Sequence, residues 1–155
     1  DAYLKHTTLS NAVRYYVNAL FGDQGLVVVD ADHRALKSLF KKVIREDLID
    51  NTPKQLTDKT DNELEALGYK PQIYARDINF FYLNNDVRER IEKQGDRYQV
   101  LNTTLSFSKE EIETLIENEP EKFSPNVILR PLYQETILPN LAYAGGPAEV
   151  ESHHQ

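Results

Sequence analysis

Residues 123–149, with the sequence FSPNVILRPLYQETILPNLAYAGGPAE, combine a helix start, a short strand and a glycine turn in one run. Ser124-Pro125 predicts the helix start, because serine accepts a hydrogen bond from a backbone N–H group and proline fits the first helical position. Residues 140–144 predict a short strand, and Gly145-Gly146-Pro147 predicts a turn where the backbone approaches another group closely. In open α/β sheets, ligands bind where such strands end. The run therefore predicts both a fold class and the place of a site.

A second candidate strand lies at residues 26–30, with the sequence LVVVD. It is apolar without alternation, which is typical of a strand covered on both faces. An acidic turn and a helical periodicity over residues 35–49 follow it, and strand, turn and helix make half of a βαβ unit. We expect residues 26–30 and 141–144 to lie side by side and parallel. The fold class that follows is α/β, with part of a Rossmann-like parallel-sheet core.

The middle of the chain has a different character. Residues 72–74 and 80–83 are typical of strands, and residues 87–93 and 97–101 predict a hairpin around Gln94-Gly95-Asp96. These strands would form antiparallel pairs outside the parallel sheet.

This change in character divides the chain into parts. We predict a Rossmann-like core part in residues 1–70, a small β-rich insertion resembling a connecting peptide in 71–105, a return to the core in 106–150, and a divergent tail in 151–155.

Capping residues mark several helix ends. Thr52-Pro53 predicts a helix start and Gly68 the end of the same helix. Ser108, followed three residues later by Glu111, is a capping box for a helix through Asn118.

The bulk composition limits the function classes. The 155 residues, of which 40% are hydrophobic and 28% charged, suit one ordinary globular domain. A net charge of −7 argues against a nucleic-acid-binding surface, because phosphate binding needs a basic face. No apolar run is long enough for a membrane span, there is no cysteine, and no histidine has a second ligand at metal-binding spacing. We expect a cytoplasmic protein without a metal, membrane or nucleic-acid partner.

Three stretches carry a resemblance to a known family: residues 25–40 (GLVVVDADHRALKSLF), residues 67–72 (LGYKPQ) and the run 123–149. From about residue 13 to residue 149, the chain closely resembles the cysteine-adding enzymes of bacillithiol biosynthesis, also called cysteine ligases. Members of that family are much longer, with a glycine- and glutamine-rich nucleotide-type loop upstream and a helical coiled coil downstream. The chain contains no methionine and looks like an internal fragment of such a protein.

The resemblance implies the activity of the full-length protein. It would add cysteine to glucosaminyl-malate in the last step of bacillithiol biosynthesis, so both compounds are expected partners. Forming an amide from a carboxylate needs activation, which makes a nucleotide such as ATP the expected cofactor. The resemblance also implies a homodimer through the coiled coil, and we expect the isolated fragment to be inactive. The alternative is a non-catalytic Rossmann-like interaction or scaffold domain, which a flat or apolar surface at the strand ends would favour.

The family signature contains the residues that we expect to bind substrate, namely Arg130, Gln134, Asn140, Tyr143, Gly145 and Gly146. An arginine can hold a carboxylate through two parallel hydrogen bonds, which suits the malate group. Amide side chains can orient sugar hydroxyls or an amine, and glycines can bring a phosphate close to backbone N–H groups. The alternatives are that Arg130 pairs with Glu135 and that Tyr143 belongs to the core.

Asp30, Glu149, Asn79 and Arg76 are further candidates. Asp30 ends the first expected strand, where its carboxylate could hold a ribose hydroxyl or an amine, or could instead cap the following helix. Glu149 could act as an acid or base, or cap a helix, while Asn79 and Arg76 lie beside the expected insertion. The sequence shows no catalytic triad, Walker-type loop or paired carboxylates, so it assigns no catalytic residue.

Overall fold

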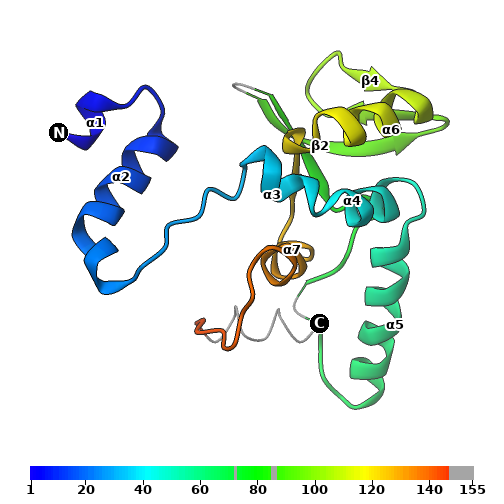
Figure 1. Ribbon diagram of the computed structural model, residues 1–155. Helices are drawn as coiled ribbons and strands as arrows, with labels where there is room; N and C mark the ends of the chain where they lie inside the picture. Colours follow the sequence, from blue (N-terminus) through cyan, green and yellow to red (C-terminus); the bar gives the residue numbers. More distant parts are fainter. Residues whose placement is uncertain (72, 85–86, 147–155) are drawn as a thin grey trace. The chain divides into compact units, whose positions relative to one another are not determined.

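The structure is a computed structural model of the 155-residue chain, and it describes residues 1–71, 73–84 and 87–146. The chain divides into two compact units, Asp1–His33 and Arg34–Gln155. Each unit has its own secondary structure (Figure 1).

The first unit is helical. It contains α1 (Ala2–Lys5), α2 (Leu9–Phe21) and the 3-10 helix η1 (Gly22–Gln24). The Thr8 hydroxyl accepts a hydrogen bond from the Asn11 N–H at 3.3 Å and so caps α2. No helix in the part of the chain that the structure describes is long and apolar enough to cross a membrane.

The strand expected at residues 26–30 does not form, and the prediction is wrong in this structure. The segment is extended but has no strand partner, and Leu26 and Val27 are 46% and 79% exposed. A strand needs neighbours for its backbone N–H and C=O groups, and an apolar sequence does not supply them.

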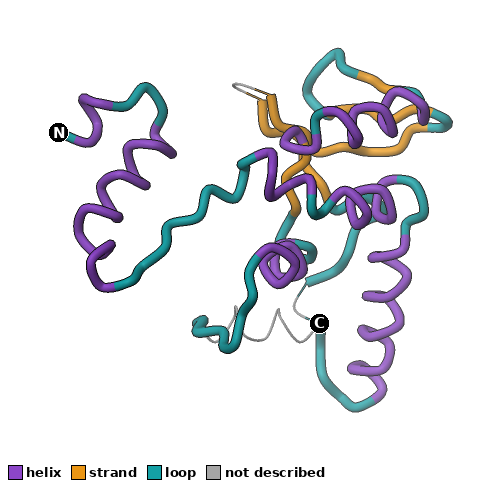
Figure 2. Tube along the Cα trace, in the orientation of Figure 1, coloured by secondary structure: helices purple, strands orange, loops and turns teal. Residues whose placement is uncertain are grey.

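The second unit is built around an antiparallel sheet (Figure 2). Its strands are β1 (Phe80–Asn84), β2 (Val87–Gln94), β3 (Arg97–Val100), β4 (Ser106–Phe107) and β5 (Phe123–Pro125), in the order β4-β3-β2-β1-β5. The expected strand at 80–83 and the expected hairpin are confirmed as β1, β2 and β3. Gly95 makes the tight turn of that hairpin with a positive φ of 61°, which glycine adopts without steric cost.

The expected parallel core is a second correction. Every described strand pair is antiparallel, and residues 141–144 form no strand. The chain turns back tightly at Gly95 between β2 and β3, and a tight turn between adjacent strands gives antiparallel pairing. Ile73 and Tyr74 also form no strand, whereas Gln72 lies outside the described residues.

The helix start expected at Ser124-Pro125 is a third correction. These residues lie in strand β5, where Ser124 is opposite Phe81 of β1. The helix starts later, as α7 (Arg130–Ile137), with Pro131 in its first turn. The Asn126 Oδ1 accepts hydrogen bonds from the Ile128 and Leu129 N–H groups and so holds the turn that leads into α7, while Pro131 takes the role expected of Pro125.

The remaining helices follow local signals. They are α3 (Arg34–Ser38), α4 (Lys41–Leu48), α5 (Thr52–Ala66), α6 (Lys109–Asn118) and the 3-10 helix η2 (Pro120–Lys122). The helix expected over 35–49 is thus split in two. The predicted start of α5, its end at Gly68 with φ 87°, and the α6 capping box are confirmed.

Helices α4 and α6 contact the sheet, and the hydrophobic core lies between sheet and helices. Phe40, Ile44, Ile112 and Phe123 are completely buried there. Burial of such side chains contributes about 1.5–3 kcal/mol each.

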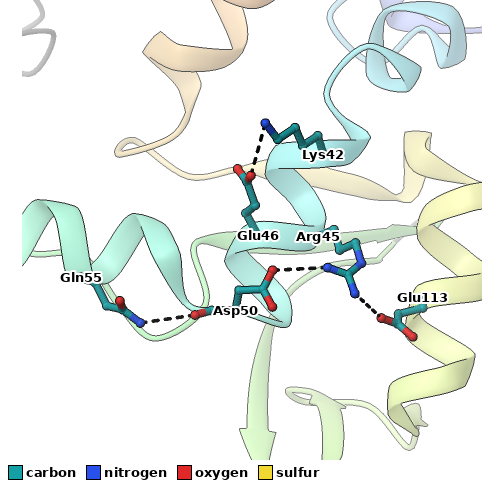
Figure 3. A network of polar contacts seen from close by, with 6 residues as sticks. All are labelled: Lys42, Arg45, Glu46, Asp50, Gln55 and Glu113. Atoms are coloured by element: carbon teal, nitrogen blue, oxygen red, sulfur yellow. Dashed lines mark hydrogen bonds and ion pairs between the residues drawn. The ribbon is translucent and has the colours of Figure 1, made fainter.

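Polar contacts also join the helices (Figure 3). The Arg45 guanidinium on α4 binds Glu113 of α6 at 3.0 Å and Asp50 at 3.3 Å, while Gln55 of α5 donates a hydrogen bond to the Asp50 carbonyl. Arg45 therefore links α4 and α6 and the start of α5 beside the core.

Strands β1 and β5 pair, so the expected parts 71–105 and 106–150 share one sheet. Where the domain boundaries lie stays a prediction.

Candidate functional site

A cavity of about 500 Å³ lies beside strands β1 and β2, and we call it the arginine cavity. Four arginines line it, contributed by three separate segments of the chain: Arg76, Arg88, Arg90 and Arg130. Among the residues that the structure describes, none of those lining the cavity is acidic, although the whole chain carries a net charge of −7. The arrangement suits an anion, because guanidinium groups bind carboxylate and phosphate oxygens through paired N–H donors.

The pairing register of the sheet places two of these arginines. Phe81 lies opposite Arg90, and Leu83 lies opposite Arg88, so the four side chains share one face of the β1–β2 pair. The neighbouring Phe80 and Tyr82 are buried in the core, although Phe80 also lines part of the cavity. Because side chains alternate along a strand, Phe81 and Leu83 lie on the face opposite to Phe80 and Tyr82.

The Phe81 ring supports the two guanidinium groups on the cavity face. The Arg88 guanidinium carbon lies 3.9 Å from the ring centroid, and that of Arg90 lies 5.9 Å away. A guanidinium that stacks on an aromatic face keeps its in-plane N–H donors available.

A hydrogen-bond network around the buried Asn79 holds the loops at the cavity. Its Oδ1 accepts from the Arg76 N–H at 3.0 Å and from the Asn126 Nδ2 at 2.9 Å, and its Nδ2 donates to the Arg76 carbonyl at 2.7 Å. The Asn126 N–H also donates to the Asn79 carbonyl at 2.8 Å. Asn79 thereby joins the segment before β1 to the segment before α7.

Behind Asn79 lies the buried carboxylate of Asp47 on α4. It accepts hydrogen bonds from the Asn79 N–H at 2.7 Å and from the Asn79 Nδ2 at 3.0 Å. Burial raises the pKa of Asp47 to about 6, because desolvation of the charged form outweighs these two hydrogen bonds. Asp47 anchors the network to the core.

Arg130 and Asn79, both singled out from the sequence, thus meet in one cavity together with Arg76. Because proline disfavours helical geometry at the residue before it, the Arg130-Pro131 pair predicts that Arg130 lies at a break between two helix pieces. This prediction is wrong: Arg130 is the first residue of α7, where its exposed side chain lines the cavity. Proline at the next position is compatible with this, because the first helical turn needs no donor from it.

The other signature residues lie outside the lining of this cavity. Gln134 is half-buried on α7, and Asn140 is exposed and donates a hydrogen bond to the Glu135 carboxylate at 2.8 Å. The structure therefore does not bring Gln134 and Asn140 to the arginines.

Gly145 and Tyr143 contact each other. A Cβ at Gly145 would lie 2.5 Å from the Tyr143 Cε1, so a side chain at this position would require the ring to shift. Tyr143 is half-buried and does not belong to the described core. Gly146 follows in an exposed, extended segment.

Asp30 holds a turn in the first unit. Its Oδ1 accepts from the Asp32 N–H at 3.1 Å, and its Oδ2 lies 3.3 Å from the Ser10 hydroxyl and 3.8 Å from Arg14. These contacts give Asp30 a turn-forming role within the first unit, and whether it also binds a ligand stays a prediction. Glu149 lies outside the described residues.

Sequence reasoning missed Phe81, Arg88, Arg90, Asn126 and Asp47. Arg88 and Arg90 alternate with half-buried residues along β2, which is a signal for one exposed strand face. That this face forms a cavity depends on Phe81 and on the loops from residues 73–79 and 125–130, which no local pattern reveals.

Comparisons with known proteins identify the family. A family model described as "Bacillithiol biosynthesis BshC, N-terminal Rossmann-like domain" matches residues 1–155. The protein named "Putative cysteine ligase BshC" from Cytophaga hutchinsonii is 47% identical over 150 residues, which are 97% of this chain and 29% of that protein. Proteins of the same name from Flavobacterium johnsoniae and Koribacter versatilis are 48% and 37% identical, each over 97% of this chain and 28% of their own length.

The chain therefore spans less than a third of the length of these curated relatives. The expected resemblance is confirmed: this chain belongs to the N-terminal Rossmann-like domain family of the bacillithiol biosynthesis protein BshC.

Proposed function

We propose that the full-length protein carrying this chain adds cysteine to glucosaminyl-malate, the last step of bacillithiol biosynthesis, and that the arginine cavity holds the malate group. The family membership supports the reaction class, since the relatives are named as cysteine ligases. The observation that carries the proposal is the meeting of Arg130 with Asn79 and Arg76 in one cationic cavity.

In this proposal the cavity positions a substrate. The reaction joins the carboxyl carbon of cysteine to the amine nitrogen of the sugar, and overall one carboxylate oxygen leaves with two protons of the ammonium group as water. Arg130 would hold a malate carboxylate through two parallel hydrogen bonds, while the Asn79 network keeps Arg76 in place beside it. Holding the malate end fixes where the sugar amine lies, and this orientation lowers the entropic part of the barrier.

A nucleotide such as ATP would supply the activation of the cysteine carboxylate. At the expected cradle for its phosphates, the turn at Gly145 and Gly146, the Tyr143 Cε1 lies 2.5 Å from where a Cβ of Gly145 would be. A phosphate at Gly145 would require this ring to move, so the proposal assigns the phosphates to no residue of the turn.

The scaffold alternative predicts a flat or apolar surface. The concave, arginine-lined cavity favours the substrate-binding function over it, although the cavity lies beside β1 and β2 and not at the ends of the two strands expected from the sequence.

The test is Arg130→Lys in the full-length protein. Lysine keeps the charge but cannot form the bidentate pair. The KM for glucosaminyl-malate should therefore rise roughly 10- to 150-fold, which corresponds to a loss of about 1.5–3 kcal/mol of binding free energy, with thermal stability unchanged. Arg34→Lys is the matched control, since Arg34 is an exposed arginine whose partner is Glu121. A variant that loses stability while the folded fraction keeps its KM would make Arg130 a structural residue and contradict the proposal.

A further inference from the structure

Three arginines of the cavity stand apart from the other arginines in the described part of the chain. Arg14, Arg34, Arg45 and Arg97 each lie within 4 Å of a carboxylate. Among the described residues, no carboxylate forms such an ion pair with Arg76, Arg88 or Arg90. Arg76, Arg88 and Arg90 line the same cavity, and within the described part of the chain no carboxylate is in ion-pair contact with them.

Their placement is specified by the fold. Arg88 and Arg90 stand on neighbouring cavity-face positions of β2 and share the Phe81 ring. The backbone of Arg76 is fixed by two hydrogen bonds to Asn79, which is itself anchored to Asp47. A cationic cluster on a rigid strand and a tied loop is an arrangement that is organised before a ligand binds.

The charge of the cluster sets the charge of its ligand. Like charges brought close together repel one another, and one anionic group can contact only part of such a cluster. A ligand with several anionic oxygens can pair with two or three guanidinium groups at once. The cavity volume of about 500 Å³ is in the range of small-molecule sites.

We propose that Arg76, Arg88 and Arg90 form a subsite for a ligand that bears two or more negative charges on carboxylate or phosphate groups. The subsite deepens the proposed function, on which it rests, because it names the arginines that would bind beside Arg130. The two sources of such a ligand are a dicarboxylate such as the malate group and the phosphates of a nucleotide.

Calorimetric titration of the full-length protein with malate, lactate and pyrophosphate tests this subsite. Lactate is a hydroxy acid with one carboxylate, whereas malate has two. If the arginines bind both carboxylates, malate should bind at least about tenfold more tightly than lactate. Arg88→Gln and Arg90→Gln should each weaken malate binding by about tenfold, and raising the salt concentration should weaken it in the wild type. Arg97→Gln is the matched control: it removes the same charge from β3, and Arg97 instead binds Ser106 outside the cavity.

If pyrophosphate binds more tightly than malate and the two variants lose this binding, the subsite is supported and is assigned to nucleotide phosphates. Equal affinities for all three anions, no measurable binding, or unchanged affinity in Arg88→Gln and Arg90→Gln would overturn it. If both variants still ligate cysteine and bind malate normally, the subsite is rejected and the ligase function is not. If the full-length protein binds malate through these arginines but does not ligate cysteine, the proposed function is rejected and the subsite is not.

Discussion

Asp47 shows how one buried residue makes stability depend on pH. Its pKa is raised from 3.8 to about 6 by burial, so the folded state holds a proton that the unfolded state releases between these values. A raised folded-state pKa means that the contribution of Asp47 to stability is fully present below pH 3.8 and is lost as the pH rises through 6. From the shift, this loss is about 3 kcal/mol.

The prediction is that Asp47→Asn removes this pH dependence. Asparagine has no proton to release, so the difference in unfolding free energy between wild type and variant should shrink by about 2 kcal/mol between pH 4 and pH 7. The variant should be less stable at low pH, since its amide cannot accept both hydrogen bonds from Asn79. Denaturant unfolding at several pH values measures both effects.

Asp23→Asn serves as the control, because Asp23 is exposed in the first unit. A wild-type to Asp47→Asn difference that stays constant from pH 4 to pH 7 would show that Asp47 does not titrate in this range.

At the scale of elements, α6 depends on its capping box. The Ser108 hydroxyl accepts from the Glu111 N–H at 3.2 Å, and the Glu111 carboxylate accepts from the Ser108 N–H at 2.6 Å. These bonds satisfy N–H groups that have no partner within the helix. Helix α6 contributes Ile112 and Ile116 to the core, so a loss at its start affects the whole unit.

Ser108→Ala should lower the unfolding free energy by about 1 kcal/mol, measured by chemical denaturation. Thr114→Ala is the control in the same helix, because the Thr114 hydroxyl bonds the Glu110 carbonyl within the helix and caps nothing. An equal loss in both variants would mean that hydroxyl removal, and not capping, causes the effect.

Helices with local signals could be predicted from the sequence, and strands without neighbours could not. Helix α5 starts at the Thr52-Pro53 pair, where proline fits the first turn, although no side chain caps it. Helix α6 follows its capping box, because capping involves residues within one turn. The 26–30 and 141–144 segments carry strand-like sequences, yet a strand exists only where another strand accepts its hydrogen bonds. At Ser124-Pro125 the local sequence favours a helix start, but the backbone pairs with β1 and forms strand β5 instead.

At the scale of the whole molecule, we predict that the isolated 155-residue chain does not ligate cysteine. The chain spans 28–29% of the length of its relatives, and the arginine cavity supplies groups that bind anions. Binding groups orient a substrate, whereas activating the cysteine carboxylate requires further chemistry. Mass spectrometry of reaction mixtures with the purified chain should show no product, with the full-length protein as the positive control. Product formation by the chain alone would place the catalytic groups among these residues.

The sequence by itself determined the family, the start of α6 at its capping box, strand β1, the β2–β3 hairpin and three members of the candidate site, Arg130, Asn79 and Arg76. These depend on neighbouring residues or on long stretches of matching sequence. The tertiary structure decided that the described sheet is antiparallel and that Arg88 and Arg90 face the same cavity as Arg130. The reason is physical: strand pairing and cavity formation bring together segments distant in sequence, and hydrogen bonds between β1 and β5 and through Asn79 set their register.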